Sequence, residues 1–342
     1  MPCFALDHIV KRLFSLQKYD ADSRYFATTG TIFANDDFDP VGVTESLRGA
    51  MKGFGTDEDQ IISTIVNHNN AQRQEISTAF KAAYGKDLID ELKSELRGDL
   101  EDVTIALMTP PRVYDARELH NAISGAGTNE STLIEIMCTR TNDEINEIKE
   151  KYKEEFENEL EDDLKSDTSG YFERLMVSLC AAGREENTDV DYDRAITDAT
   201  AFHEAGAGAW GTEEAEMNAI LCLRSLPQLR QIIVNYEEFT GTTIEESIKN
   251  ECSGTLQNGY LAIVQSAKDT PAFFARRLKD CFAGFGTNDN DLIRIIVSRS
   301  EIDLADIRDS YESIYEKPLL DAIADECSGD YKNMLQAVVN PQ

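Results

Sequence analysis

The sequence predicts an all-α protein of four homologous repeats, each about 70 residues long and made of about five short helices. Two observations predict this fold class. A Gly-Thr pair recurs four times, and apolar residues follow each pair at the same distances, in steps of four residues. The composition agrees, because 28% charged residues and only 8 prolines in 342 residues suit amphipathic helices better than disorder.

The Gly-Thr pairs set the length of the repeat. Their glycines are Gly55, Gly127, Gly211 and Gly286, so the copies follow one another at similar intervals, of which the second is the longest. Apolar side chains stand at positions +6, +10, +21, +25, +33 and +37 counted from each glycine. Because residues four apart lie on one face of a helix, each such pair predicts a buried helix face. In the first repeat these residues are Ile61, Ile65, Ile76, Phe80, Leu88 and Leu92.

Polar residues also keep fixed places in the repeat. The Thr after each glycine predicts a helix N-cap, with acidic residues in the turn that follows. An acidic residue stands at position +40 counted from every glycine, and a further glycine follows three residues later. The four acids are Glu95, Asp167, Glu251 and Glu326.

This template divides the chain into six segments. Residues 1–42 form an N-terminal arm that precedes the repeats. The repeats cover residues 43–109, 114–181, 191–267 and 271–339. The longest interval, from Gly127 to Gly211, places a polar linker, 182–190, between the second and third repeats, and this linker predicts a seam between two halves.

The chain is strongly acidic, with a net charge of −31. That charge excludes nucleic acid as the main partner, because neutralising phosphates needs a basic face. It also excludes simple electrostatic docking on an anionic membrane, unless a multivalent cation lies between the two surfaces. No secretory leader and no apolar run long enough to span a membrane are expected. Seven cysteines without a Cys-x-x-Cys pair indicate reduced, mostly buried thiols in a cytoplasmic protein.

Catalytic motifs are missing from the sequence. None of the 4 histidines lies in a Gly-x-Ser-x-Gly or His-Glu-x-x-His context, and no phosphate-binding or dinucleotide fingerprint occurs. The sequence therefore predicts a binding protein and not an enzyme.

The segments before the Gly-Thr pairs are rich in glycine and read MKGFG, ISGAG, GAGAWG and FAGFG. Glycine allows a sharp turn that points several backbone carbonyls at one place. Carbonyl oxygens together with a carboxylate are ligands that Ca²⁺ takes, with water in the remaining positions. Because each site has only one carboxylate, the predicted affinity is weak, on the order of 10⁻⁴ M.

The chain resembles the annexin family over about 300 of its 342 residues. The resemblance rests on Gly-x-Gly-Thr with the downstream acid in four repeats, and on segments such as AQRQEIS, GAGTNE and VSRSEIDL. It implies a curved disc with calcium loops on the convex face, and calcium-dependent binding to acidic phospholipids. The resemblance implies these ligands, by main-chain oxygen or carboxylate: Met51, Gly53, Gly55 and Glu95; Ile123, Gly125, Gly127 and Asp167; Gly206, Ala209, Gly211 and Glu251; Phe282, Gly284, Gly286 and Glu326.

Three loops carry an aromatic residue just before the second glycine, namely Phe54, Trp210 and Phe285. Exposed aromatic rings suit the headgroup region of a membrane, and the alternative is that they fold against their own loops. Lys52 keeps the loop lysine that is common in the family, whereas Ser124 stands in its place in the second repeat. Loss of this cation predicts that lipid affinity depends more on calcium.

One position breaks the repeat pattern in the first copy. An Arg stands at position +13 counted from the second glycine in three repeats, as Arg140, Arg224 and Arg299, and His68 replaces it in the first. We interpret the Arg as structural and His68 as a local substitution.

The resemblance also implies a central polar seam between the two halves. The matching residues are Asp115, Glu118, Glu135, Arg140 and Arg294. Taken alone, these residues predict buried ion pairs. The alternative interpretation is a hydrophilic passage that conducts calcium ions.

The leading expectation is a calcium-dependent membrane-binding protein, cytoplasmic and peripherally bound to acidic phospholipid when calcium rises, with a role in membrane organisation or trafficking. The resemblance adds two expected partners: a protein bound by the N-terminal arm, and further copies of the chain on the membrane. Two alternatives stay open: a helical scaffold for cytoskeletal or signalling proteins, and a calcium-conducting channel.

Overall fold

The structure is a computed structural model, which describes residues 28–53, 55–125, 127–206, 214–284 and 286–341. Within these ranges the secondary structure is helical and contains no strand, which confirms the predicted all-α class. The helices form four groups of five, and each group follows one copy of the repeat template.

Each repeat uses its five helices in the same order. Repeat 1 contains α2 (Pro40–Ala50), α3 (Glu58–Val66), α4 (Asn70–Tyr84), α5 (Leu88–Glu95) and α6 (Gly98–Met108). Repeat 2 contains α7 (Pro111–Ile123), α8 (Glu130–Thr139), α9 (Asn142–Phe156), α10 (Leu160–Asp167) and α11 (Gly170–Cys180). Repeat 3 contains α12 (Tyr192–Gly206), α13 (Glu214–Leu223), α14 (Leu226–Thr240), α15 (Ile244–Glu251) and α16 (Gly254–Lys268). Repeat 4 contains α17 (Thr270–Cys281), α18 (Asp289–Arg299), α19 (Leu304–Tyr315), α20 (Leu319–Glu326) and α21 (Gly329–Val339).

The apolar positions of the template form the cores of the repeats. Every residue at the six template positions is buried in all four repeats, and the most exposed of them, Met217, is 3% exposed. Burial of such side chains is the main favourable contribution to folding. The four-residue steps therefore identify the inward faces of the second, third and fourth helix of each repeat, as predicted.

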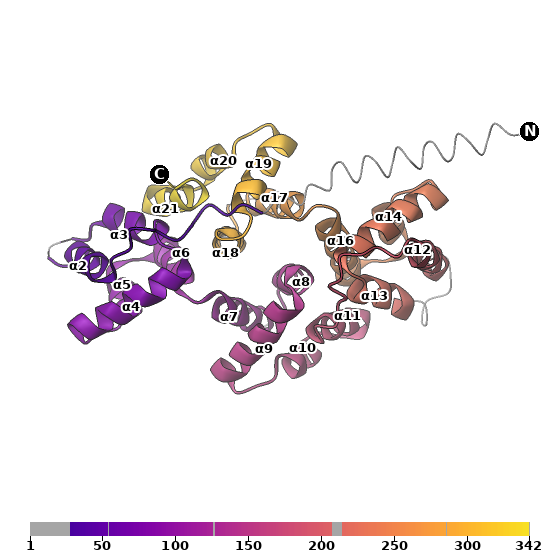
Figure 1. Ribbon diagram of the computed structural model, residues 1–342, viewed down its shortest axis with the longest axis horizontal. Helices are drawn as coiled ribbons and strands as arrows, with labels where there is room; N and C mark the ends of the chain where they lie inside the picture. The colour runs from indigo at the N-terminus through magenta and orange to yellow at the C-terminus, as the bar shows by residue number, and fades with distance from the viewer. Residues whose placement is uncertain (1–27, 54, 126, 207–213, 285, 342) are drawn as a thin grey trace, which may run out of the picture.

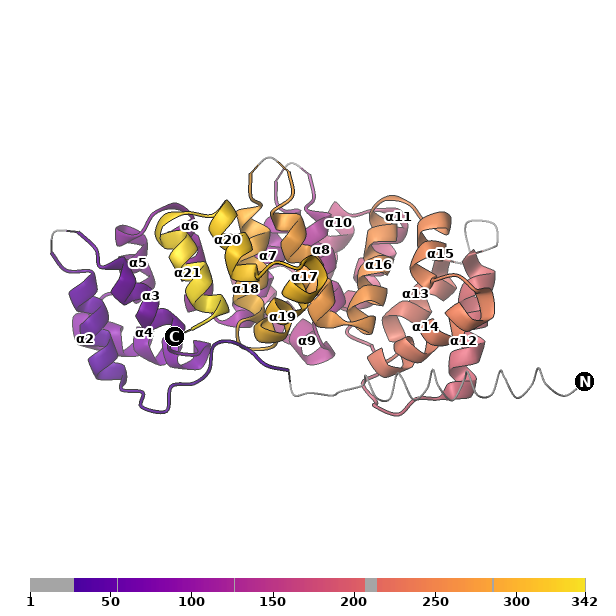
Figure 2. The ribbon, with the colours of Figure 1, turned by 90° about the horizontal axis from the view of Figure 1, so that it is seen from above.

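The four repeats lie around a common centre (Figure 1) and form a curved slab when seen from the side (Figure 2). The loops that join α2 to α3, α7 to α8 and α17 to α18 all emerge on the convex side of this slab, at the top of Figure 2. We call this side the loop face. Residues 28–39, which we call the strap, run along the opposite side.

The strap joins repeat 4 to repeat 1. The backbone N–H groups of Thr31 and Ile32 donate to the Ser300 carbonyl over 2.7 and 3.0 Å. Gly30 passes so close to repeat 4 that a Cβ on it would lie 2.7 Å from the backbone of Glu301. At its other end, Asn35 exchanges two hydrogen bonds of 2.8 Å with the side chain of Gln72.

The linker between repeats 2 and 3 uses the same device. Asp191 donates its N–H to the Gln228 side chain and accepts from it at its carbonyl, both over 2.9 Å. Gln228 and Gln72 occupy the same template position in their repeats, counted from the Gly-Thr glycine. The two connections are therefore related by the internal duplication.

The six described cysteines are all buried thiols. Burial raises the pKa of the thiols of Cys222 and Cys281 to about 12, so they stay protonated and unreactive at neutral pH. This agrees with the predicted buried thiols. In the described ranges, no helix is both long and apolar enough to cross a bilayer.

Candidate functional site

The glycines of the loop face adopt a backbone conformation that other residues avoid. Gly53 and Gly55 have φ angles of +128° and +91°, and the matching glycines of repeats 2 and 4 have values between +95° and +113°. A Cβ added to any of them would meet no atom within 4 Å. Glycine is thus needed here for its backbone freedom, and not to leave room for a neighbour.

A backbone hydrogen bond closes each of these loops. Asp57 N–H donates to the Ala50 carbonyl over 3.0 Å, and Asn129 and Asn288 make the same bond to Ala122 and Cys281 over 2.7 and 2.9 Å. Among the described residues, no backbone N–H donates to the loop carbonyls that the resemblance implies as ligands in repeats 1, 2 and 4. Those carbonyls keep their lone pairs for another partner.

The predicted acids lie beside these loops, because each is the last residue of the fourth helix of its repeat. In repeat 1 the Thr56 hydroxyl donates to the Glu95 carboxylate over 3.0 Å. In repeat 2 Thr128 donates to the Asp167 carboxylate over 2.6 Å. In repeat 4 Thr287 reaches the main-chain oxygen of Glu326 instead, over 3.5 Å. The repeated Thr therefore joins the loop to the helix that carries the acid.

The prediction that this Thr caps the following helix is wrong. The N-cap of α3 is Asp57, whose side chain accepts from the Gln60 N–H. Asn129 and Asn288, one residue after the Thr of their repeats, cap α8 and α18 in the same way. The Thr hydroxyl is instead a donor to the acid or its backbone, and the residue after it supplies the capping oxygen.

The third site is described only in part. Ala209, Trp210 and Gly211 lie outside the described residues, as do Phe54 and Phe285, so their predicted roles stay predictions. The two described members, Gly206 and Glu251, line the same small cavity. A Cβ on Gly206 would lie 3.2 Å from the Glu251 Cγ, so the fold does bring this pair together.

The anchors of the loops are buried, whereas their tips face solvent. Met51 and Phe282 pack into the core at 5% and 9% exposure, and Ile123 is partly buried. Lys52 is exposed. The described residues contain no group of three or more acidic, histidine or cysteine side chains placed to hold a metal. A cation bound here would depend on carbonyls and one carboxylate, a hard oxygen donor set that fits Ca²⁺.

Two of the predicted sites share one groove, which the sequence could not indicate. A groove of about 670 Å³ lies between repeats 1 and 4 and includes both Glu95 and Glu326 in its walls. Four more acids line it: Glu58, Asp99, Asp289 and Asp330. Burial, and then the nearby charge of Asp99, raise the pKa of Asp289, which accepts a hydrogen bond of 3.0 Å from the Tyr331 hydroxyl.

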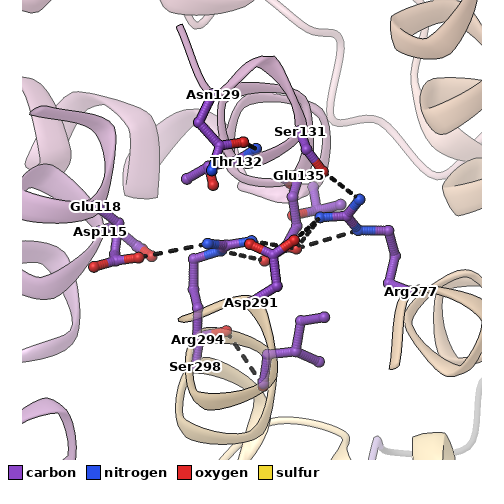
Figure 3. Close-up of polar contacts among 12 residues, drawn as sticks. Asp115, Glu118, Asn129, Ser131, Thr132, Glu135, Arg277, Asp291, Arg294 and Ser298 are labelled. Atoms are coloured by element: carbon purple, nitrogen blue, oxygen red, sulfur yellow. Dashed lines mark hydrogen bonds and ion pairs between the residues drawn. The ribbon is translucent and has the colours of Figure 1, made fainter. Parts of the chain in front are cut away.

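The central seam is a network of ion pairs between repeats 2 and 4 (Figure 3). Arg294 on α18 donates to both oxygens of Glu135 on α8, over 2.9 and 3.0 Å. Arg277 on α17 donates to the same carboxylate over 2.8 Å. Asp291 and Glu118 complete the surroundings of Arg294, at 2.8 and 3.5 Å.

The other two predicted seam residues form a separate pair. Arg140 donates to both oxygens of Asp115 over 2.8 and 3.0 Å, inside repeat 2. Sequence reasoning did not identify Arg277 and Asp291 as members of the seam. Their only signal is charge on helices that otherwise read as core, in the segments PAFFARRLK and NDNDLIRII.

Charge pairing decides the ionisation of the seam. Burial alone would raise the pKa of Glu135, but attraction to Arg294 and Arg277 outweighs it and lowers the pKa to about 2. For Glu118 burial is the larger effect and raises the pKa, although Arg294 opposes it. Glu135 is therefore the ionised centre of the network.

Comparison with known proteins agrees with this architecture. The annexin family model matches residues 43–107, 114–179, 197–263 and 273–338. The chain is 48% identical to human annexin A7 over 312 residues, which are 91% of this chain and 64% of that protein. It is 45% identical to human annexin A4 over 90% of this chain and 96% of that protein.

Solved structures share the fold. A structure of annexin III superposes with a TM-score of 0.90 at 42% identity, over 94% of this chain and 99% of that one. A structure of calcium-bound annexin (Sm)1 gives a TM-score of 0.83 at 34% identity, over 91% and 93% of the two chains. The four matched repeats, the shared fold and the level of identity lead to one conclusion: the chain belongs to the annexin family.

Proposed function

We propose that the chain binds acidic phospholipid membranes in a calcium-dependent manner through its loop face. One observation carries this proposal: three loops with uncommitted carbonyls, each beside an acid, emerge on the same side of the slab (Figure 2). A planar partner could touch all of them at once. The coarser basis is membership of the annexin family, and calcium-bound members of the fold are known.

Calcium would be held by main-chain oxygens and one carboxylate in each repeat. The proposed ligands are Met51, Gly53, Gly55 and Glu95; Ile123, Gly125, Gly127 and Asp167; Gly206, Ala209, Gly211 and Glu251; Phe282, Gly284, Gly286 and Glu326. Bound calcium supplies positive charge and coordination positions that lipid phosphate oxygens can take. The protein supplies the preformed loops and places the carboxylates.

The charge of the chain explains why calcium would control this binding. With a net charge of −31, the protein is repelled by an anionic surface. The acidic groove shared by Glu95 and Glu326 concentrates this repulsion on the loop face. Cations bound there would reverse the local sign. Lys52 and the aromatic residues Phe54, Trp210 and Phe285 are proposed as direct contacts with lipid.

Single substitutions of the acids test the proposal. We expect Glu95→Gln, Asp167→Asn, Glu251→Gln and Glu326→Gln each to raise the calcium needed for half-maximal binding to phosphatidylserine vesicles by roughly two- to fivefold, because the other linked sites still hold the protein on the surface. Vesicle sedimentation across a calcium series measures the midpoint. The control is Glu312→Gln, an exposed acid on α19, away from the loop face.

Equal midpoints for all four variants and the control would contradict the assignment of these carboxylates. Thr56→Val gives a finer check. It removes the hydroxyl that holds Glu95 but leaves the carboxylate in place. We therefore expect a smaller shift than for Glu95→Gln, in the same direction.

A further inference from the structure

One internal position is filled in three repeats and open in the first. In repeats 2 and 3 the Arg at template position +13 is paired with an Asp of the first helix: Arg140 with Asp115, and Arg224 with Asp198. In repeat 4 Arg299 pairs with Asp303 and lies over the Phe274 ring. Each guanidinium fills the space beside its first helix.

Repeat 1 has lost both members of this pair. His68 stands in place of the Arg, and Val43 stands where Asp115 stands in repeat 2. Both residues line a groove of about 510 Å³. Helices α2 and α3, strap residues such as Phe33 and Asn35, and Pro341 near the C-terminus form its walls. We call it the uncharged groove, because no Asp, Glu, Lys or Arg lines it.

His68 supplies the groove with an unused hydrogen-bonding atom. Its side chain is buried, and its Nδ1 lies 2.7 Å from the Thr64 carbonyl. A carbonyl can only accept, so Nδ1 carries the proton and Nε2 of the neutral ring is an acceptor. Among the described residues, this buried Nε2 has no hydrogen-bond partner. Buried polar atoms are nearly always paired, so the atom calls for a donor from elsewhere.

We propose that the uncharged groove binds a small uncharged organic molecule that carries a hydroxyl or N–H donor on an apolar body. The volume lies within the range of small-molecule sites. Charged ligands are disfavoured, because no opposite charge in the walls would offset the loss of their hydration. Val43, Val66 and the exposed ring of Phe33 suit the apolar part, and His68 Nε2 accepts from the donor.

Binding at this groove would also hold the strap in place. The walls come from repeat 1, from the strap and from the C-terminal residues, and Thr31 already ties the last two together by donating to the Val338 carbonyl over 2.6 Å. A ligand that binds only the folded arrangement raises the unfolding temperature as its concentration exceeds its dissociation constant. This gives a second readout that does not depend on calcium or lipid.

The test uses 4-fluorophenol as probe and the full chain, at about pH 8, where a histidine ring is ordinarily neutral. We expect a saturable change in the fluorine NMR signal and a rise in unfolding temperature. The double variant Val43→Asp/His68→Arg rebuilds the ion pair of repeats 2 and 3 inside the groove, and should lose both effects. The ether 4-fluoroanisole, which has no donor, should bind up to about tenfold more weakly.

A second variant guards against failure of the double variant to fold. Ser63→Trp places a large ring at an exposed wall position and should block the probe, whereas Ser313→Trp, on the exposed face of α19, should bind it normally. Absence of a saturable signal with the unmodified chain would overturn the proposal. Equal binding by Ser63→Trp and Ser313→Trp, or by the phenol and its ether, would overturn the assigned place or the role of His68.

Discussion

The fourfold variant Glu95→Gln/Asp167→Asn/Glu251→Gln/Glu326→Gln is expected to lose calcium-dependent binding to phosphatidylserine vesicles almost completely. Each acid is the only carboxylate among the ligands proposed for its loop, so neutralising it removes the only formal charge of that ligand set. Linked weak sites multiply their effect, and their joint loss is correspondingly larger than the sum of single losses suggests. Sedimentation with vesicles up to millimolar calcium measures the effect.

A matched control separates site chemistry from net charge. The variant Glu75→Gln/Glu147→Gln/Asp193→Asn/Glu312→Gln removes the same four negative charges from exposed helix positions away from the loops. Because the net charge falls equally in both proteins, this control should bind at least as well as the unmodified chain. Full binding by the fourfold site variant would show that the loops do not carry the interaction.

Glu135→Gln is expected to destabilise the fold by about 3–5 kcal/mol, the cost of leaving buried charges without their partner. The substitution removes the carboxylate that Arg294 and Arg277 share, and both guanidinium groups stay in the seam. Urea unfolding followed by circular dichroism measures the change. Glu161→Gln, which breaks only an exposed pair with Lys165, is the control and should change little.

The same carboxylate predicts a dependence on pH. The folded pKa of Glu135 is lowered from 4.5 to about 2. Its contribution to stability is therefore complete above pH 4.5 and is lost as the pH falls towards 2. The Glu135→Gln variant should lose less stability than the unmodified chain across this interval. Parallel acid-unfolding curves for the two proteins would contradict the pairing.

The parts of the fold that repeat could be predicted, because four copies of one pattern average out local accident. Ile61 and its three counterparts share a buried helical face, and the four-residue steps reveal it without any knowledge of the fold. The acids were found in the same way. Glu95 is distant from its loop in sequence, yet one hydrogen bond from Thr56 in space.

Other features could not be predicted, since they arise where different repeats meet. Glu95 and Glu326 share a groove because repeat 4 closes against repeat 1, and no spacing in the chain encodes that distance. Arg277 enters the seam for the same reason, since its partner Glu135 belongs to another repeat. The cap of α3 was misassigned because Thr56 and Asp57 are both good capping residues, and only the loop geometry decides between them.

The substitution at His68 shows how a break in a repeat gains meaning from structure. In sequence it is a single exception to a structural Arg. In the fold, the loss of the guanidinium coincides with the loss of its partner at Val43 and with an open groove that both residues line. An exception that removes both members of a buried pair leaves an opening that a ligand can fill.

The central claim, that calcium on the loop face joins this protein to acidic lipid, is tested most directly by sedimenting the unmodified chain with phosphatidylserine vesicles across a calcium series. Vesicles of phosphatidylcholine serve as the control, and excess chelator is added at the end. The account predicts pelleting that rises with calcium, requires the acidic lipid and reverses with the chelator. Protein that stays in the supernatant at millimolar calcium, or that pellets equally well without calcium, would contradict it.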